Sequence, residues 1–529
     1  MRYRQLYVFF VLAAAAIHNL AKPLAPPWDD IRVKHTWHTV PPNWETVGNP
    51  PAGAVIDLHV ALKPHHENAI VDALYEVSDP RSPKRVISNP PARRGGTYGC
   101  RFLRCRYGAH LSREQVAQLV APHPATLQLI NTWLENHDIP ASSVSLSGGN
   151  WLTVTGVPVP QAGELLRASY QVYRHTETND TILRTIGYAL PAVLHQHVRT
   201  VVPTTYFASK GTLSPTSRRR PVAVTEDREV RNLKSPLITP SELRSLYRTA
   251  AYEPNARGRN KLGLLGHQDE YPSEEDLNLF MSNLRSDGVH ADYTVVKING
   301  GGYDPRHPGI EGNLDMQYAQ AMAYPTPHVF YSVGGQIAGI PESNKPAEDD
   351  QWFAWLEYLI EEPEVPQTIS VSYGNFERDI PPEYATALCE MFAQLGARGV
   401  SVLVASGDDG VGEGTCETYD GSGRVRFIPE FPSSCMCSIF YMSLFGAVYP
   451  SRSLHIAATV SQVPMSLAWA ARWETPRLRR ASLGAASQTI LLARRIRTRR
   501  CPSSWIASAA GMKICTSAVL FFFGPILAW

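Results

Sequence analysis

The sequence predicts an α/β fold, a doubly wound parallel sheet preceded by a smaller α+β unit. From residue 237 onward, apolar strand-like runs alternate with helical patterns, as strands and crossover helices do in a parallel sheet. Residues 30–204 instead place helices in succession between paired short strands, which is typical of an α+β domain of the split βαβ type. At 529 residues and 44% apolar, the chain can bury two such cores.

The N-terminal unit, residues 30–204, is expected to begin with a strand and a helix. An arginine-rich, acid-free block then interrupts it at 85–106. Ser112 and Gln115 have the spacing of a capping box, which marks the start of the next helix. The expected strands are 54–63, 142–148 and 151–156, and the expected helices are 66–78, 113–121, 124–136 and 160–173.

The C-terminal unit, residues 237–435, carries the strand and helix alternation. Its expected strands are 261–266, 293–298, 328–333, 367–372 and 400–405, and its expected helices are 274–285, 310–323, 348–361 and 383–396. In the last helix, Tyr384, Leu388 and Leu395 recur at helical spacing on one face. Ligand-binding and catalytic groups of such sheets lie beyond the carboxyl ends of the strands.

Three segments lie outside the two units. Residues 1–21 have a basic start and a short apolar run, which predicts a signal peptide and export; the alternative, a membrane anchor, has too few apolar residues to span a bilayer. Residues 205–236 contain three consecutive arginines and predict a processing linker, or else a solvated loop that is not cleaved. Residues 436–529 form a basic and apolar tail.

Charge is divided unevenly along the chain. Residues 435–529 hold eleven Arg or Lys and a single acid, Glu474, although the whole chain carries a net charge of only +2. The remainder is therefore acidic, which argues against nucleic acid as a partner. The apolar end, 514–529, is short of a membrane span, so no membrane partner is expected. The eight scattered cysteines do not define a disulfide framework, although export would allow bridges.

Glu311 and Asp315 are the first candidate catalytic pair. They are four residues apart on the expected helix 310–323, so they share a face. Two carboxyl groups this close repel, and one should keep its proton to a higher pH, which suits general acid/base chemistry under acid conditions. From spacing alone, the acidic face of a surface helix is the simpler interpretation.

Asp408 and Asn179 are further candidates. Asp408 follows the expected strand 400–405 in a tight turn, where Asp commonly forms an Asx turn. Its position favours a functional role, because that turn should open on the same sheet edge as the helix carrying Glu311. Asn179 begins an Asn-Asp-Thr glycosylation sequon, a weak signal because such triplets arise by chance.

The order of several motifs is more specific. Glu-x-x-Leu-Asp-x-Gln-Tyr at 311–318 is followed by Ser-Val-Ser-Tyr-Gly at 370–374, a Gly-Ala-Arg-Gly-Val run ending in Ser-Gly-Asp at 396–408, and Phe-Pro-Ser-Ser-Cys at 431–435. Together they resemble the sedolisin (serine-carboxyl peptidase) family, fungal tripeptidyl-peptidase type. The resemblance runs from about residue 30 to residue 435.

The resemblance implies a subtilisin-like fold behind an activation prodomain, with Ser, Glu and Asp in place of Ser, His and Asp. Glu311 would be the general base, Asp315 its orienting partner, and protonated Asp408 the donor to the oxyanion. It also implies a secreted zymogen that binds calcium, is inhibited by its own prodomain, and releases tripeptides from the free N-termini of protein or peptide substrates at acid pH.

The chain departs from the family pattern in its last part. The family nucleophile lies in Gly-Thr-Ser and the family calcium site uses Asp carboxylates, whereas this chain has no Gly-Thr-Ser and no Asp after Asp420. Ser517, in Cys-Thr-Ser-Ala, lacks the glycine of that turn. The serine and the calcium site are therefore expected to be missing, the sheet incomplete at its C-terminus, and the chain inactive as written.

Two explanations of this departure remain open. The blocks 85–106 and 436–529 share an arginine-rich, acid-poor composition, which suggests translated intron or a shifted reading frame. Alternatively, the chain is a non-catalytic protein that binds peptides or inhibits a relative through its prodomain.

Overall fold

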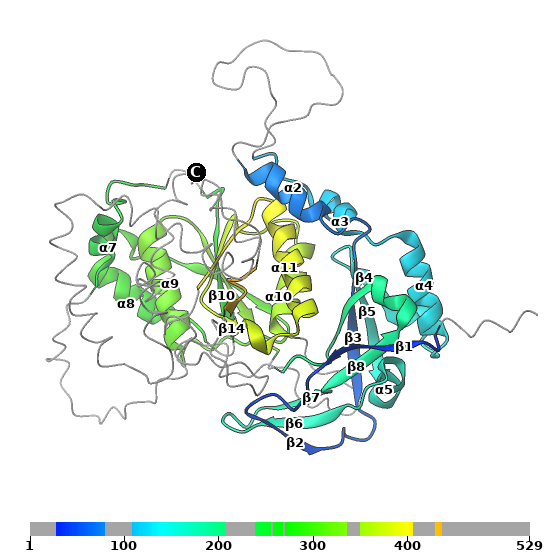
Figure 1. The fold of residues 1–529 in the computed structure, drawn as a ribbon. Helices are drawn as coiled ribbons and strands as arrows, with labels where there is room; N and C mark the ends of the chain where they lie inside the picture. Colours follow the sequence, from blue (N-terminus) through cyan, green and yellow to red (C-terminus); the bar gives the residue numbers. More distant parts are fainter. Residues whose placement is uncertain are drawn as a thin grey trace, which may run out of the picture.

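The computed structural model describes residues 28–79, 108–207, 238–254, 258–267, 270–335, 350–405 and 429–435. They form an N-terminal unit (28–207) and a C-terminal unit (238–435), which lie side by side in Figure 1. The expected signal peptide, the block 85–106, the tail 436–529, Asp408 and Ser517 lie outside the described residues. Over the described part of the chain, no helix is long and apolar enough to cross a membrane.

A five-stranded parallel sheet forms the centre of the C-terminal unit. Its strands are β10 (Leu262–His267), β11 (Tyr293–Ile298), β12 (His328–Val333), β13 (Thr368–Val371) and β15 (Ser401–Val404). They lie in the order β11-β12-β10-β13-β15, and every pair is parallel. The predicted α/β class with a parallel sheet is confirmed. After β10 the chain forms the edge strand β11 and then β12 on one side, and afterwards β13 and β15 on the other side, so a topological switch point lies beside β10.

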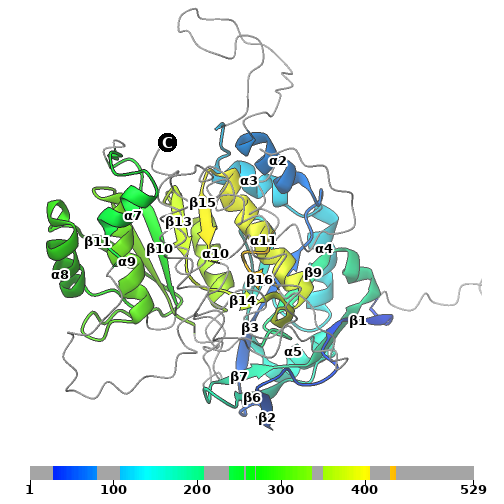
Figure 2. The same ribbon diagram turned by 60° about the vertical axis from the view of Figure 1, so that its left-hand side comes forward.

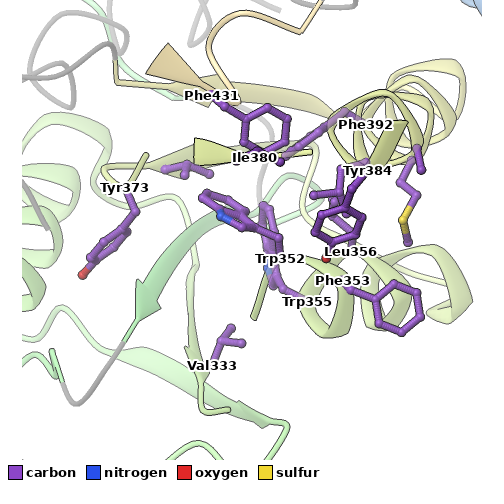
Figure 3. Packing of buried hydrophobic residues seen from close by; sticks show 14 of the residues in the cluster. Val333, Trp352, Phe353, Trp355, Leu356, Tyr373, Ile380, Tyr384, Phe392 and Phe431 are labelled. Carbon is purple, nitrogen blue, oxygen red and sulfur yellow. The ribbon is translucent and has the colours of Figure 1, made fainter. Parts of the chain in front are cut away.

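Helices cover both faces of this sheet (Figure 2). They are α7 (Pro240–Leu246), α8 (Glu274–Leu284), α9 (Ile310–Ala323), α10 (Gln351–Glu361) and α11 (Pro382–Ala397). Leu264 of β10 packs with α8 and α9, whereas its neighbour Leu265 packs with α10 and α11, because successive strand side chains point to opposite faces. Figure 3 shows the aromatic side of this core, where Trp352, Trp355 and Tyr384 are fully buried.

The N-terminal unit combines antiparallel sheets with four helices. Its strands are β1 (Ile31–Thr36), β2 (Trp44–Gly48), β3 (Val55–Leu62), β4 (Val144–Ser147), β5 (Trp151–Pro158), β6 (Gln171–His175), β7 (Thr181–Arg184), β8 (Gly187–Pro191) and β9 (Val198–Val202). They form sheets β4-β5-β3-β9, β2-β6-β7 and β1-β8. The helices are α2 (Ala69–Ser78), α3 (Arg113–Val120), α4 (Pro124–Glu135) and α5 (Val159–Leu166).

Two local expectations for this unit had different outcomes. The capping box is confirmed: Ser112 Oγ accepts a hydrogen bond from Gln115 N at 3.2 Å, and Gln115 Oε1 accepts one from Ser112 N at 2.9 Å. The expected helix 160–173 is wrong in its second half, because Arg167 adopts a left-handed conformation with φ of 48° and ends α5 at Leu166. Residues 171–175 then form β6, which pairs with β2 and β7.

The two units share one hydrophobic cluster. α11 contacts α2 and β9 of the N-terminal unit on one side and β15 on the other, so it lies between the sheets of the two units in Figure 1. Trp151 of β5 stacks on Phe353 of α10 with ring centroids 4.6 Å apart. Tyr206 and Phe207, within the stretch where a linker is expected, are buried in the same cluster.

An ion pair is buried at this contact. Arg199 of β9 donates to Glu390 of α11, with Nη2 and Oε1 2.6 Å apart and both side chains about nine-tenths buried. Burial raises the pKa of Glu390 to about 7, the charges of Glu67 and Glu383 add to the rise, and Arg199 opposes it. Glu390 therefore takes up a proton as the pH falls below neutral, which weakens its attraction to Arg199.

A disulfide joins Cys389 of α11 to Cys435, the last described residue, across a sequence separation of 46. β14 (Asn375–Phe376), which precedes α11, pairs with β16 (Glu430–Phe431), which precedes Cys435. This pair could not be selected from the sequence, because the spacing of the eight cysteines matches no disulfide framework. The bridge ties the end of the C-terminal unit to the helix that carries the contact between units.

We predict that Arg199→Ala destabilises the chain more at pH 8 than at pH 5. At pH 8 the substitution leaves Glu390 buried without its cation, a loss on the order of 3 kcal/mol, whereas at pH 5 Glu390 is protonated in both proteins. Urea denaturation at the two pH values measures the free energy of unfolding. Arg32→Ala, which removes the exposed pair Arg32–Asp30, is the control and should cost less than about 1 kcal/mol. Equal losses for the two variants would contradict the prediction.

Replacing both Cys389 and Cys435 by Ser should lower the free energy of unfolding by about 2–4 kcal/mol, because the reduced unfolded chain gains the entropy that the closed loop excludes. Urea denaturation of the native and double-Ser chains checks this. A reductant should destabilise the native chain by a similar amount and leave the Ser variant unchanged. An unchanged unfolding midpoint in the Ser variant would rule the bridge out as a stabilising element.

Candidate active site

The site lies where β10 and β13 end and α9 begins. β10 ends at His267, and the chain returns at Glu270 beside the first turn of α9. β13 ends at Val371, so Ser372 and Tyr373 emerge at the same edge. This edge contains the switch point beside β10, the location at which open α/β sheets bind ligands. The fold therefore brings together residues from three separate stretches of the chain.

Glu311 and Asp315 are both buried on α9, with exposed fractions of 5% and 1%. Their side chains are hydrogen-bonded to each other. Asp315 Oδ1 also accepts a hydrogen bond from Ser372 Oγ at 3.0 Å. The interpretation of this pair as the acidic face of a surface helix is therefore wrong, because the helix turns these carboxyl groups toward the end of the sheet.

The surroundings of the pair favour the protonated form of Asp315. The pKa of Asp315 is raised well above its usual value, chiefly by burial and next by the charge of Glu311, with a further contribution from Glu270. The hydrogen bond from Ser372 acts in the opposite direction, since it favours the charged carboxylate. Because two hydrogen-bonded carboxyl groups need one proton between them, this arrangement agrees with the expectation that one keeps its proton to a higher pH.

Aromatic and imidazole rings line the neighbouring part of the site. His267 is completely buried, with its ring centroid 5.1 Å from that of Trp352 and 5.0 Å from that of Tyr373. Burial lowers the pKa of His267 to about 3. Its ring nitrogens have no hydrogen-bond partner within the described ranges. His267 therefore adds no positive charge that could neutralise the carboxyl pair in mild acid.

Glu270 approaches α9 from the β10 side. Its Oε2 accepts a hydrogen bond from the backbone N of Glu311 at 3.0 Å and a longer one from Gly312 N at 3.5 Å. Sequence reasoning missed both this residue and Ser372 as parts of the site. The available signal for Glu270 was its place just past a buried strand. Ser372 belongs to the Ser-Val-Ser-Tyr-Gly motif at 370–374, which contributes to the family resemblance.

The other candidate residues lie elsewhere. Asp408 falls outside the described residues; β15, which precedes it, pairs with β13 in parallel. Asn179 is exposed in the turn between β6 and β7 of the N-terminal unit, with φ of 60°. Among the described residues, no group of three or more His, Cys, Asp or Glu could hold a metal ion. No calcium ligand is therefore assigned there.

Comparison with known proteins places the chain among peptidases. The model of the Pro-kumamolisin activation domain matches residues 104–207. Tripeptidyl-peptidase SED2 of Arthroderma otae is 30% identical over 452 residues, 83% of this chain and 70% of that protein. A probable tripeptidyl-peptidase SED2 of Arthroderma benhamiae is 30% identical over 422 residues, 77% of this chain and 66% of that protein.

A solved structure of Pseudomonas sedolisin, a serine-carboxyl proteinase in complex with two molecules of pseudo-iodotyrostatin, aligns over 38% of this chain and 51% of its own. Its identity is 21% and its TM-score 0.28, so the assignment does not depend on it. The assignment depends on the relatives that match most of both chains. The chain belongs to the sedolisin family of serine-carboxyl peptidases, as a relative of the fungal tripeptidyl-peptidases.

Proposed function

We propose that the chain is the precursor of a secreted, acid-acting serine-type peptidase that removes tripeptides from the free N-termini of proteins. The observation that carries this proposal is the buried, hydrogen-bonded pair of Glu311 and Asp315 at the carboxyl edge of a parallel sheet. The curated relatives are named as tripeptidyl-peptidases, which supports the substrate class. The match of 104–207 to an activation domain supports a precursor.

In the proposed reaction, Glu311 is the general base. It takes the proton of a serine hydroxyl as that oxygen attacks the scissile carbonyl, and it later returns the proton to the leaving amine. Asp315, protonated and held by Ser372, orients Glu311 through the hydrogen bond that the two carboxyl groups share. Asp408, protonated in acid, would donate to the oxyanion. The role of oxyanion donor requires acid conditions, because a carboxyl group donates only below its pKa. Glu311, as the base, must be ionised when it accepts the serine proton.

The nucleophile is the missing part of this scheme. The chain as given contains no Gly-Thr-Ser, and we propose that it is inactive until that segment is restored. The calcium site expected for the family would lie in the same missing part. The foreign composition of 85–106 and 436–529 supports a reading-frame or splicing origin for both blocks.

A second candidate function is inhibition of an active relative by the N-terminal unit. Its favouring observation is a separate hydrophobic core in that unit, which includes Leu58, Trp133 and Leu190, apart from the cluster shared with α10 and α11. A unit with its own core has the means to fold and bind a relative in trans. Inhibition of a relative by the isolated unit would support this function, and no effect at equimolar concentration would exclude it.

Sequencing of the transcript across codons 80–110 and 430–529 should find a form that restores Gly-Thr-Ser. That protein should release tripeptides from an N-terminally free peptide in acid. Glu311→Gln should lower kcat/KM at least about 100-fold, because the amide cannot accept the serine proton. Glu275→Gln, an exposed acid on α8, is the matched control and should leave the rate unchanged. A restored protein without tripeptide release would refute the proposed activity.

Asp315→Asn should stabilise the chain progressively as the pH rises from about 4 to about 7. The folded-state pKa of Asp315 is raised, so its contribution to stability is complete below the unfolded pKa and is lost as the pH rises through the folded value. The Asn variant does not titrate and escapes this loss. Urea denaturation at several pH values measures the difference, with Asp72→Asn, exposed on α2, as control. A pH-independent difference between Asp315→Asn and the native chain would count against a proton held at Asp315.

A further inference from the structure

The first turn of α9 lacks a capping side chain of its own. Its N-cap residue, Gly309, has no side chain, so the free backbone N–H groups at this end need an acceptor from elsewhere. Glu270, which precedes the helix by about forty residues, supplies the acceptor through Glu311 N at 3.0 Å. A carboxylate at a helix N-terminus is also favoured by the helix dipole.

The glycines of this turn fit closely around Glu270. A Cβ at Gly309 would overlap the Glu270 carboxylate, and a Cβ at Gly312 would lie 2.7 Å from the Glu270 carbonyl oxygen. Real Cβ atoms essentially never approach backbone atoms this closely. Both glycines therefore let Glu270 reach the helix end, and this contact fixes the backbone from which the Glu311 side chain projects.

Glu270 also acts through its charge. Among the described residues it is one of three carboxyl groups that lie together here, and its charge contributes to the raised pKa of Asp315. In the described part of the chain, Tyr373 after β13 interacts with all three carboxyl groups, and His267 at the end of β10 contacts the Tyr373 ring. Burial lowers the pKa of His267 to about 3 and raises that of Tyr373, so both stay neutral in mild acid. Within the described residues, the negative charge of Glu270 is therefore not offset by either ring.

We propose that Glu270 is a positioning residue of the active site, which holds the first turn of α9 in place and keeps a negative charge beside the Glu311–Asp315 pair. Its carboxylate contacts the backbone of the proposed general base and touches no substrate atom in this role. The negative charge of Glu270 favours retention of the proton that Glu311 and Asp315 share. The hydrogen bond from Glu311 N to Glu270 fixes the position of the helix turn that carries Glu311. The catalytic consequence rests on the proposed function, whereas the contact and the charge do not.

The test is a titration that does not need activity. The full chain is labelled with ¹³C at the aspartate carboxyl carbons, and the Asp315 signal is identified by its loss in Asp315→Asn. Glu270→Gln keeps an acceptor oxygen for the helix but removes the charge, so it should lower the titration midpoint of Asp315 by about 0.5–1 pH unit. Glu270→Ala should lower the titration midpoint of Asp315 by a similar amount. It should also lower the urea midpoint of unfolding, because alanine has no acceptor for the Glu311 backbone N–H. Glu275→Gln should change neither.

An Asp315 midpoint that stays within about 0.2 pH unit of the native value in Glu270→Gln would overturn the proposal. If Glu270→Ala does not fold, Glu270→Gln decides alone, since its amide retains the cap. In the form with Gly-Thr-Ser restored, the acid limb of kcat/KM should move to lower pH in Glu270→Gln by the same interval. A shifted titration in a restored protein that releases no tripeptide would refute the proposed function and leave the positioning role supported.

Discussion

The burial of two carboxyl groups on adjacent turns of one helix is the constraint on which the site depends. Both side chains are buried, and burial together with the charge of Glu311 raises the pKa of Asp315 well above its usual value, which favours a proton held on the pair. Two neighbouring groups agree with this state, because Glu270 adds negative charge and His267 remains neutral. The hydrogen bond from Ser372 to Asp315 opposes it, since it favours the charged carboxylate. An environment built in this way suits a reaction that runs in acid.

The sheet supplies the rigidity that such a pair requires. β10 is buried on both faces, with α8 and α9 on one side and α10 and α11 on the other, so the chain leaves it at a fixed point. Glu270, three residues after the end of β10, lies beside the first turn of α9 as a result. The N-terminal unit packs on α11 and on Phe353 of α10, two of the helices that support the sheet. Positioning of the carboxyl groups is therefore a property of the whole C-terminal unit.

The regular part of this architecture could be predicted from the sequence, and the contacts between distant segments could not. The strands 293–298 and 328–333 and the helix 310–323 agree with β11, β12 and α9 at both ends, because Gly and Pro residues mark most of their boundaries. The expected helix 160–173 runs into the start of β6, because the left-handed conformation of Arg167, which non-glycine residues rarely adopt, has no sequence signal. The role of Glu270 depends on its contact with Glu311, about forty residues further along the chain. Local sequence patterns do not predict contacts between residues so far apart.

The bond between Cys389 and Cys435 has a consequence for the biosynthesis of the chain. Cys435 leaves the ribosome 46 residues after its partner, so the covalent link can form only when α11 and the segment carrying β16 have met. An intact disulfide therefore indicates that the segment carrying β16 has packed in its native position beside α11, whatever sequence follows residue 435. Every C-terminal continuation encoded after this cysteine, spliced or unspliced, starts from the same anchored position beside α11.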